Sequence, residues 1–213
     1  MADDAAELAA RRSDMVAAQI ESRGIRDARV LAAMRRVPRH LFVPPDLRSR
    51  AYDDEPLPIG DGQTISQPYI VAYMTEALGL KGQEKVLEVG TGSGYQTAVL
   101  AELARKIYTV ELVAGLSVPA KSLLEKLGYA NIRFLLGDGT FGWAESSPYD
   151  AVMVTAAAAS VPRPLEDQLG EAGRMIIPVG SGFQELVLIR REKTGFSRTR
   201  LLPVRFVPLI SSQ

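Results

Sequence analysis

The stretch "VLEVGTGSGYQTAVLAEL", residues 86–103, reads as a buried strand, a glycine turn and a helix. Its glycines follow a G-x-G-x-G rhythm, whereas the dinucleotide-binding fingerprint needs a sixth-position glycine or alanine. That sixth position is Tyr95 when counted from Gly90 and Thr97 when counted from Gly92. The turn therefore predicts a nucleotide-like ligand and disfavours the pyrophosphate of a nicotinamide or flavin cofactor.

Three carboxylates lie at or near the carboxyl ends of successive predicted strands, where open α/β sheets bind ligands. Glu88 would repel a pyrophosphate and attract a cationic group, such as the ammonium and sulfonium of S-adenosylmethionine. Glu111 lies 21 residues after Gly90 and is expected to bind ribose hydroxyls. Asp138 follows the third strand, where it would bind an adenine amine. The ordinary alternatives are a surface carboxylate for Glu111 and a plain turn for Asp138.

The rest of the chain continues this alternation of strands and helices, which predicts a doubly wound, mostly parallel α/β sheet. Five strands are expected at 85–89, 106–112, 132–138, 149–157 and 173–180, with helices near 95–104, 116–127 and 162–169. Two further strand-like runs, 184–192 and 198–209, are separated only by "KTGFS". A connection this short forces an antiparallel hairpin at the C-terminal end.

The first 80 residues differ from the rest and are expected to form a helical and loop cap on the sheet core of residues 81–213, within a single domain. Helices are predicted at 4–22, ending at Gly24, at 27–37, capped by Asp27 and stopped before Pro38, and at 67–78. Residues 38–66 read as an ordered loop. Because loops of this length are commonly functional, we expect part of the site there.

Composition excludes several functional classes. The charges balance, with 25 Lys and Arg against 25 Asp and Glu, so the basic excess of a nucleic-acid binder is missing. No cysteine and a single histidine, His40, disfavour disulfides, thiol catalysis and a metal site, and we expect His40 to pack or to form a hydrogen bond. No signal peptide or membrane span is evident. We expect a cytoplasmic, monomeric protein without nucleic-acid or membrane partners.

The chain resembles the protein-L-isoaspartate O-methyltransferases, a class I, Rossmann-like family that depends on S-adenosylmethionine. The resemblance covers roughly residues 10–209. It rests on "RVPRHLFVP", "PLPIGDGQTISQPYIVAYMTEAL", "VLEVGTGSGYQTAVLAEL", "YTVEL", "GDGTFGW", "YDAVMVTAAA", "GRMIIPVG" and "RFVPL". The glycine turn is shared with many methyltransferases, whereas "GQTISQP" is specific to this family.

The resemblance implies protein repair. Such an enzyme methylates the free α-carboxyl of L-isoaspartyl residues in damaged proteins, and the ester then closes to a succinimide that partly reopens to aspartate. It implies Ser66 as the active-site residue. The implied cofactor contacts are Gln63, Thr64, Ile65, Ser66, Glu88, Gly90, Thr91, Gly92, Glu111, Leu112, Asp138, Gly139 and Thr155. The implied substrate contacts are Ile59, Thr64, Ser66, Val207, Pro208 and Leu209, and no metal is implied.

The reaction suits the residues that are present. A carboxyl group with a pKa of about 4 is already ionised at neutral pH, so that no general base is needed. A neutral hydroxyl from Ser66 and backbone N–H groups at a helix N-terminus would hold the carboxylate without quenching its nucleophilicity. The alternative for Ser66 is an ordinary N-cap. Residues 207–209 are expected to pair as an edge strand with the substrate backbone, or else to pack as a core edge.

Two rival functions remain open at this point: a class I methyltransferase for a small molecule or another carboxylate, and a non-catalytic module that binds S-adenosylmethionine. The chain also departs from the family at two places near the expected substrate rim. Ala159 and Ser160 replace a common proline and acid, and the chain continues after "FVPL" as "ISSQ". Both departures bear on peptide affinity and leave the cofactor site unchanged.

Overall fold

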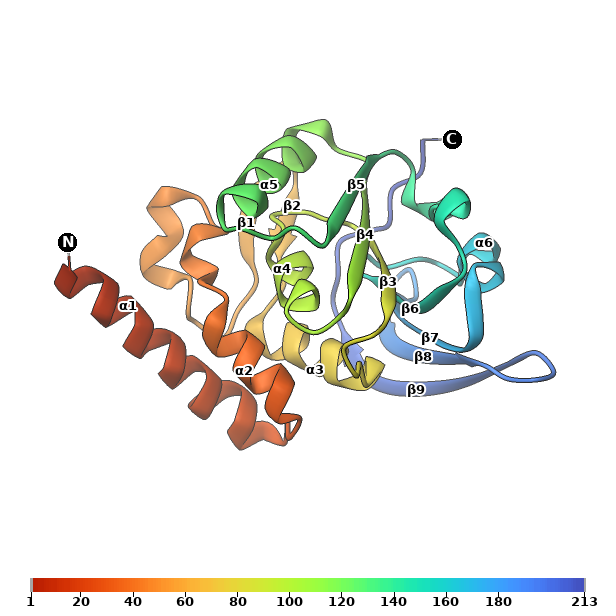
Figure 1. Cartoon of the computed structure of the whole chain (residues 1–213), viewed down its shortest axis with the longest axis horizontal. Coiled ribbons are helices and arrows are strands. Elements are labelled where there is room, and N and C mark those ends of the chain that lie inside the picture. The colour runs from red at the N-terminus through yellow and green to blue at the C-terminus, as the bar shows by residue number, and fades with distance from the viewer. Residues whose placement is uncertain (1, 213) are drawn as a thin grey trace.

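The computed structural model describes residues 2–212 and is built around one seven-stranded sheet (Figure 1). The strands lie in the order β5-β4-β3-β6-β7-β8-β9. Neighbours from β5 to β7 pair in parallel, while β8 is antiparallel to both β7 and β9. The strand bounds are β3 (Lys85–Val89), β4 (Lys106–Glu111), β5 (Ile132–Leu136), β6 (Tyr149–Val154), β7 (Leu169–Val179), β8 (Gln184–Arg191) and β9 (Phe196–Val204). The predicted doubly wound sheet with a C-terminal hairpin is confirmed.

The helices also follow the sequence pattern closely. They are α1 (Ala2–Met15), α2 (Ala28–Arg36), α3 (Pro68–Leu78), α4 (Tyr95–Ala101), α5 (Ala114–Lys126) and α6 (Arg163–Asp167). A π turn (Val16–Ile20) and a 3₁₀ turn (Glu21–Arg23) continue α1 as far as Gly24, whose left-handed φ of 101° ends the helix as predicted. The Asp27 side chain accepts hydrogen bonds from the amides of Arg29 and Val30 and caps α2.

Several predicted boundaries differ from the structure. The region 38–66, which was predicted to be an ordered loop, contains 3₁₀ turns (Arg39–Leu41, Pro45–Arg50) and a hairpin of β1 (Leu57–Gly60) with β2 (Gln63–Ile65). The hairpin turn is tight, with φ values of 96° at Gly60, 50° at Asp61 and 70° at Gly62. The last strand stops at Val204 rather than at residue 209.

The sheet buries a separate apolar layer on each face, because side chains alternate along every strand. Val86 belongs to the layer beneath α2, α3 and α4, while Leu87 and Val89 belong to the layer on the opposite face, which α6 covers. The first layer also contains Met34 from α2, fully buried, and Leu57 from β1. The N-terminal cap therefore completes one of the two cores of the sheet.

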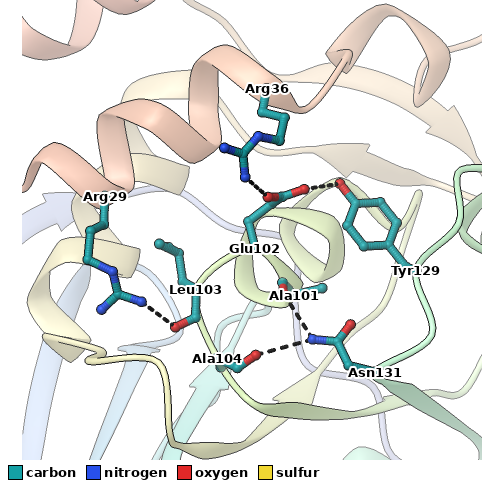
Figure 2. Close-up of polar contacts among 8 residues, drawn as sticks. All are labelled: Arg29, Arg36, Ala101, Glu102, Leu103, Ala104, Tyr129 and Asn131. Atoms are coloured by element: carbon teal, nitrogen blue, oxygen red, sulfur yellow. Dashed lines mark hydrogen bonds and ion pairs between the residues drawn. The ribbon is translucent and has the colours of Figure 1, made fainter.

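Polar contacts from α2 attach this cap to the segment between α4 and β4. The Arg29 guanidinium donates to the carbonyl oxygens of Leu80 at 2.8 Å and Leu103 at 3.0 Å. Two turns further along α2, the Arg36 guanidinium forms an ion pair with the Glu102 carboxylate (Figure 2). Glu102 follows α4 directly, so the pair links the first and second thirds of the chain.

The same segment is held from the side of β5. The Tyr129 hydroxyl donates to the second oxygen of Glu102 at 3.0 Å, opposite the Arg36 contact (Figure 2). The Asn131 side-chain amide donates to the carbonyl oxygens of Ala101 at 2.9 Å and Ala104 at 3.1 Å. The Ala101 carbonyl belongs to the last residue of α4 and has no helical partner, while the Ala104 carbonyl belongs to the turn that follows.

Candidate active site

A cleft opens at the carboxyl ends of β3, β4 and β6, and we call it the inner cleft. The chain leaves β4 and β5 on one side of β3 and places β6 on the other, so the cleft lies where the strand order reverses. Open α/β sheets bind their ligands at this place. All but two of the predicted cofactor residues line it: Gln63, Thr64, Ile65, Ser66, Gly90, Thr91, Gly92, Glu111, Leu112, Gly139 and Thr155.

The glycine turn forms the floor of the inner cleft. Gly90 and Gly92 have left-handed φ values of 95° and 53°, which residues with a side chain rarely adopt. A Cβ atom on Gly90 would lie 2.3 Å from Oγ1 of Thr155. That hydroxyl donates to the carbonyl oxygens of Val89 at 3.0 Å and Gly90 at 2.7 Å. Thr155, the residue that follows β6, therefore holds the turn in place through these hydrogen bonds. Backbone without side chains faces the cleft.

Glu111 occupies its predicted place at the end of β4. Its Oε2 accepts a hydrogen bond from the Gly92 amide at 2.8 Å, and its Oε1 accepts one from the Val113 amide at 2.9 Å. The residue is 8% exposed and lines the inner cleft. Each oxygen keeps a lone pair for a further donor, so the fixed carboxylate can accept from a pair of ligand hydroxyls.

Glu88 does not line the inner cleft, so its predicted contact with a cationic ligand is wrong in this geometry. It is fully buried and points toward α4, because it lies on the same face of β3 as Val86. Oε2 accepts hydrogen bonds from the hydroxyls of Thr97 at 2.6 Å and Thr109 at 2.7 Å. Burial raises the pKa of the Glu88 carboxyl to about 8, against the lowering effect of these bonds. Glu88 therefore links β3 to α4 and β4.

Asp138 follows β5 as predicted, yet its neighbour Gly139, and not Asp138, lines the inner cleft. Its Oδ1 accepts from the amide (2.9 Å) and hydroxyl (2.6 Å) of Thr140. Its Oδ2 accepts from the Ser211 hydroxyl (2.8 Å), the Ser212 amide (2.7 Å) and the Ser212 hydroxyl (3.0 Å). Partial burial alone would raise the pKa of Asp138, but these bonds hold it well below its usual range. The C-terminal tail, residues 211–212, thus forms hydrogen bonds with the carboxylate that was predicted to bind an adenine amine.

A second hollow of about 440 Å³ adjoins the inner cleft, and we call it the outer cavity. Four residues line both spaces and form the wall between them: Thr64, Ser66, Thr155 and Val207. We call these four residues the shared wall. Two ligands that entered from the two sides would meet there.

Ser66 is half-buried in this shared wall and does not cap α3. The helix begins at Pro68, and the preceding residue is Gln67, whose side chain makes no cap bond. The Gln67 amide nitrogen instead donates to the Asp54 carbonyl at 3.1 Å. The alternative interpretation of Ser66 as an ordinary N-cap is therefore wrong. Its hydroxyl forms no hydrogen bond with another residue within 2–212 and can bind a ligand.

Five of the six predicted substrate residues border these spaces: Thr64, Ser66 and Val207 line both, while Pro208 and Leu209 line the inner cleft. Ile59 lies in a groove beside α5 and reaches neither the inner cleft nor the outer cavity. The Ala157 amide donates to the Val207 carbonyl and the Leu209 amide donates to the Ala157 carbonyl, both at 2.8 Å. This edge is therefore already paired within the chain. Pro208 has no amide hydrogen to offer a substrate strand.

The sequence analysis missed several lining residues. Ser93, Gln96, Val113, Leu116 and Ile210 line the inner cleft, and Gln67, Ile70 and Arg205 line the outer cavity. Ser93 lies within the quoted glycine turn, so its position could have been noticed. Arg205 and Ile210 gave no signal, because only the folded chain brings the C-terminal segment to the cleft.

Comparisons with known proteins agree with this geometry. A family model described as "Protein-L-isoaspartate(D-aspartate) O-methyltransferase (PCMT)" matches residues 10–213. The chain belongs to this family. It is 55% identical over 200 residues to protein-L-isoaspartate O-methyltransferase 1 of Syntrophobacter fumaroxidans, which covers 93% of this chain and 94% of that protein. A relative from Dictyoglomus turgidum is 56% identical over 191 residues, or 89% of this chain and 87% of its own length.

Solved structures of this family share the fold. One protein-L-isoaspartate O-methyltransferase superposes with a TM-score of 0.84 at 31% identity, over 92% of this chain and 65% of that longer chain. A structure from Plasmodium falciparum, described as a putative protein-L-isoaspartate O-methyltransferase in complex with S-adenosyl-L-homocysteine, has a TM-score of 0.82 at 26% identity. It covers 94% of this chain and 99% of that chain. None of the helices among residues 2–212 combines the length and apolar character that crossing a bilayer requires.

Proposed function

We propose that this protein transfers a methyl group from S-adenosylmethionine to the free α-carboxyl of L-isoaspartyl residues in damaged proteins. The observation that carries the proposal is the shared wall, where Thr64, Ser66, Thr155 and Val207 separate two adjoining spaces. The inner cleft takes the cofactor and the outer cavity takes the peptide. The methyl ester then closes to a succinimide, from which aspartate is partly recovered.

The residues of the inner cleft fit this cofactor. Glu111 presents a carboxylate that two backbone amides hold in place, suited to a ribose diol. A ligand can approach the backbone of Gly90 and Gly92 closely, because neither residue carries a side chain. Gly90 cannot readily be replaced, because a Cβ atom there would collide with Thr155. Among the described residues that line the cleft, Glu111 alone carries a charge, so a cationic ligand is favoured there.

The chain's own contribution to the reaction is positioning. When bound, S-adenosylmethionine supplies an electrophilic methyl group on a sulfonium. The acceptor carboxylate is already ionised at neutral pH, so no residue has to remove a proton. The Thr64 and Ser66 hydroxyls donate to the carboxylate and orient one of its oxygens toward the inner cleft. Positioning of this kind is worth up to roughly 7–11 kcal/mol of the barrier.

The deciding experiment compares two versions of one peptide, with isoaspartate or normal aspartate at a single position. We expect methyl incorporation and methanol release from the isoaspartyl peptide, and neither from its aspartyl twin. Cofactor binding without methyl transfer to either peptide would indicate the non-catalytic module. Transfer to small carboxylic acids, but not to the isoaspartyl peptide, would indicate the small-molecule methyltransferase.

The proposal extends to the setting of the enzyme, which we take to be a cytoplasmic monomer that binds neither nucleic acid nor membranes. The balanced charge supports this view, because it gives no general attraction for polyanions or anionic lipids. Light scattering coupled to gel filtration tests the oligomeric state. A mass near 23.1 kDa is expected, and twice that value would contradict the monomer.

A further inference from the structure

The outer cavity contains one charged residue that the mechanism above does not use. Among the described residues that line it, only Arg205 carries a charge. The other lining groups are hydroxyls, an amide and apolar side chains from residues 56–70, from Thr155 and from residues 203–207. A guanidinium stays protonated at every physiological pH. The cavity therefore presents a permanent positive charge to whatever peptide enters it.

Arg205 is held on a fixed piece of backbone. On one side, Val204 ends β9 and pairs with Gln184 of β8. On the other side, the Gln184 side chain accepts from the Phe206 amide at 2.6 Å and donates to the Phe206 carbonyl at 3.2 Å. The following residue, Val207, is bonded to Ala157 at 2.8 Å. The backbone on both sides of Arg205 is thus held in place where this residue lines the outer cavity.

The Arg205 side chain is available for an external partner. The residue is exposed, and no hydrogen bond or ion pair links its side chain to another residue within 2–212. The carboxylate of Glu185, which follows Gln184 on β8, is already paired with Arg200 at 3.4 Å. The positive charge of Arg205 is therefore not neutralised inside the described part of the chain.

The position of Arg205 indicates which part of the substrate it meets. The acceptor carboxylate has to reach the shared wall, where Ser66 borders the inner cleft. Arg205 lines the outer cavity but not the inner cleft. It therefore faces those residues of the peptide that do not reach the shared wall. We propose that Arg205 is a specificity-determining residue that favours isoaspartyl sites flanked by acidic side chains. This inference rests on the proposed function.

The test uses three isoaspartyl peptides that differ only in the residues on either side of the isoaspartate: two Glu, two Gln or two Lys. For the native protein we expect kcat/KM to be about two- to five-fold higher with Glu than with Gln, as for an exposed ion pair, and lowest with Lys. Arg205→Gln should make the Glu and Gln peptides equal, Arg205→Lys should keep the preference, and Arg205→Glu should invert it. The preference should shrink at 1 M salt, because screening weakens exposed charge pairs.

The matched control is Arg190→Gln, which removes an exposed arginine from β8 outside the cavity. It should leave the order of the three peptides unchanged. Equal rates for all three peptides with the native protein would overturn the inference, as would an Arg205→Gln variant that keeps the order or loses activity equally on every peptide. If no isoaspartyl peptide is methylated, the proposed function itself fails, which is a distinguishable result.

Discussion

At the scale of single residues, Ser66 decides whether the proposed site is correct. Its hydroxyl lies in the shared wall and caps no helix, so it contributes little to folding. We expect Ser66→Ala to lower kcat/KM on isoaspartyl peptide by about 10–100-fold, because a donor to the acceptor is lost. The free energy of unfolding should change by less than about 0.5 kcal/mol.

Enzyme assays at saturating S-adenosylmethionine, together with thermal melts, measure the two effects. Full activity of the variant under these conditions would remove Ser66 from the mechanism. A large drop in melting temperature would instead return it to a structural role.

Glu88 predicts a pH dependence of stability. Its pKa is raised from an ordinary 4.5 to about 8 by burial, so between these values the folded state holds a proton that the unfolded state has lost. The stability contributed by Glu88 is complete below about pH 4.5 and disappears as the pH rises toward 8. Glu88→Gln is neutral throughout, and we expect its stability to decline less over this range than that of the native protein. Chemical denaturation at pH 5, 6, 7 and 8 measures both curves, and parallel curves would contradict the assignment.

At the scale of elements, the glycine turn and β6 are predicted to be energetically coupled through Gly90 and Thr155. Gly90→Ala meets both a left-handed φ and a hydroxyl 2.3 Å from the new Cβ, so we expect a cost of roughly 2–5 kcal/mol and loss of cofactor binding. Thr155→Ala alone should cost about 1 kcal/mol through its lost hydrogen bonds.

The double variant Gly90→Ala/Thr155→Ala separates the two causes. It removes the collision but keeps the backbone strain, so its cost should be smaller than the sum of the two single costs. Urea denaturation of all four proteins gives the coupling energy. Strict additivity would mean that the close contact in the structure has no energetic weight.

The elements that the sequence predicted well are those with a local signal. The strand–helix alternation and the cap at Asp27 can both be predicted from residues that are close together in the sequence. The β1–β2 hairpin was missed because Pro56 and Pro58 argue against a strand, and only pairing with residues 63–65 reveals it. The sequence placed Glu88 in the cleft because its spacing from the glycines matched the expected pattern. Side chains along β3 alternate between the two faces of the sheet, and that of Glu88 points toward α4.

At the scale of the whole molecule, the N-terminal cap and the sheet core are expected to unfold together as one domain. They share an apolar layer, and the contacts of Arg36 and Tyr129 with Glu102 lie at their junction (Figure 2). Tyr129→Phe should lower the free energy of unfolding by about 1 kcal/mol, because one partly buried hydrogen bond is lost.

Two probes report on different parts of the molecule during this unfolding. Far-UV circular dichroism follows the helices, while the fluorescence of Trp143, the one tryptophan in the sequence, follows the opposite face of the sheet, where it packs on Tyr108. We expect both midpoints to coincide and to shift equally in Tyr129→Phe. Earlier loss of the helical signal would indicate that the cap unfolds as a separate unit.

The candidate site could be predicted only as far as each contact is local. The residues of 63–66 and 90–92 lie in short motifs, and the structure brings them together. The bonds from Ser211 and Ser212 to Asp138 span more than 70 residues of chain, and the position of Arg205 depends on Gln184 of another strand. Neither of these two contacts produces a periodic pattern or a bias in composition that could be recognised in the sequence.

The clasp between the tail and Asp138 has a practical consequence for handling the enzyme. Helix α1 and the C-terminal segment lie on opposite sides of the molecule (Figure 1), and within residues 2–212 it is Ser211 and Ser212 that donate to the Asp138 carboxylate next to the inner cleft. A purification tag or a biosensor linker fused behind residue 213 would pull on that clasp and distort measured cofactor affinities. Attachment ahead of α1 leaves it undisturbed, so immobilised enzyme should be tethered from that side.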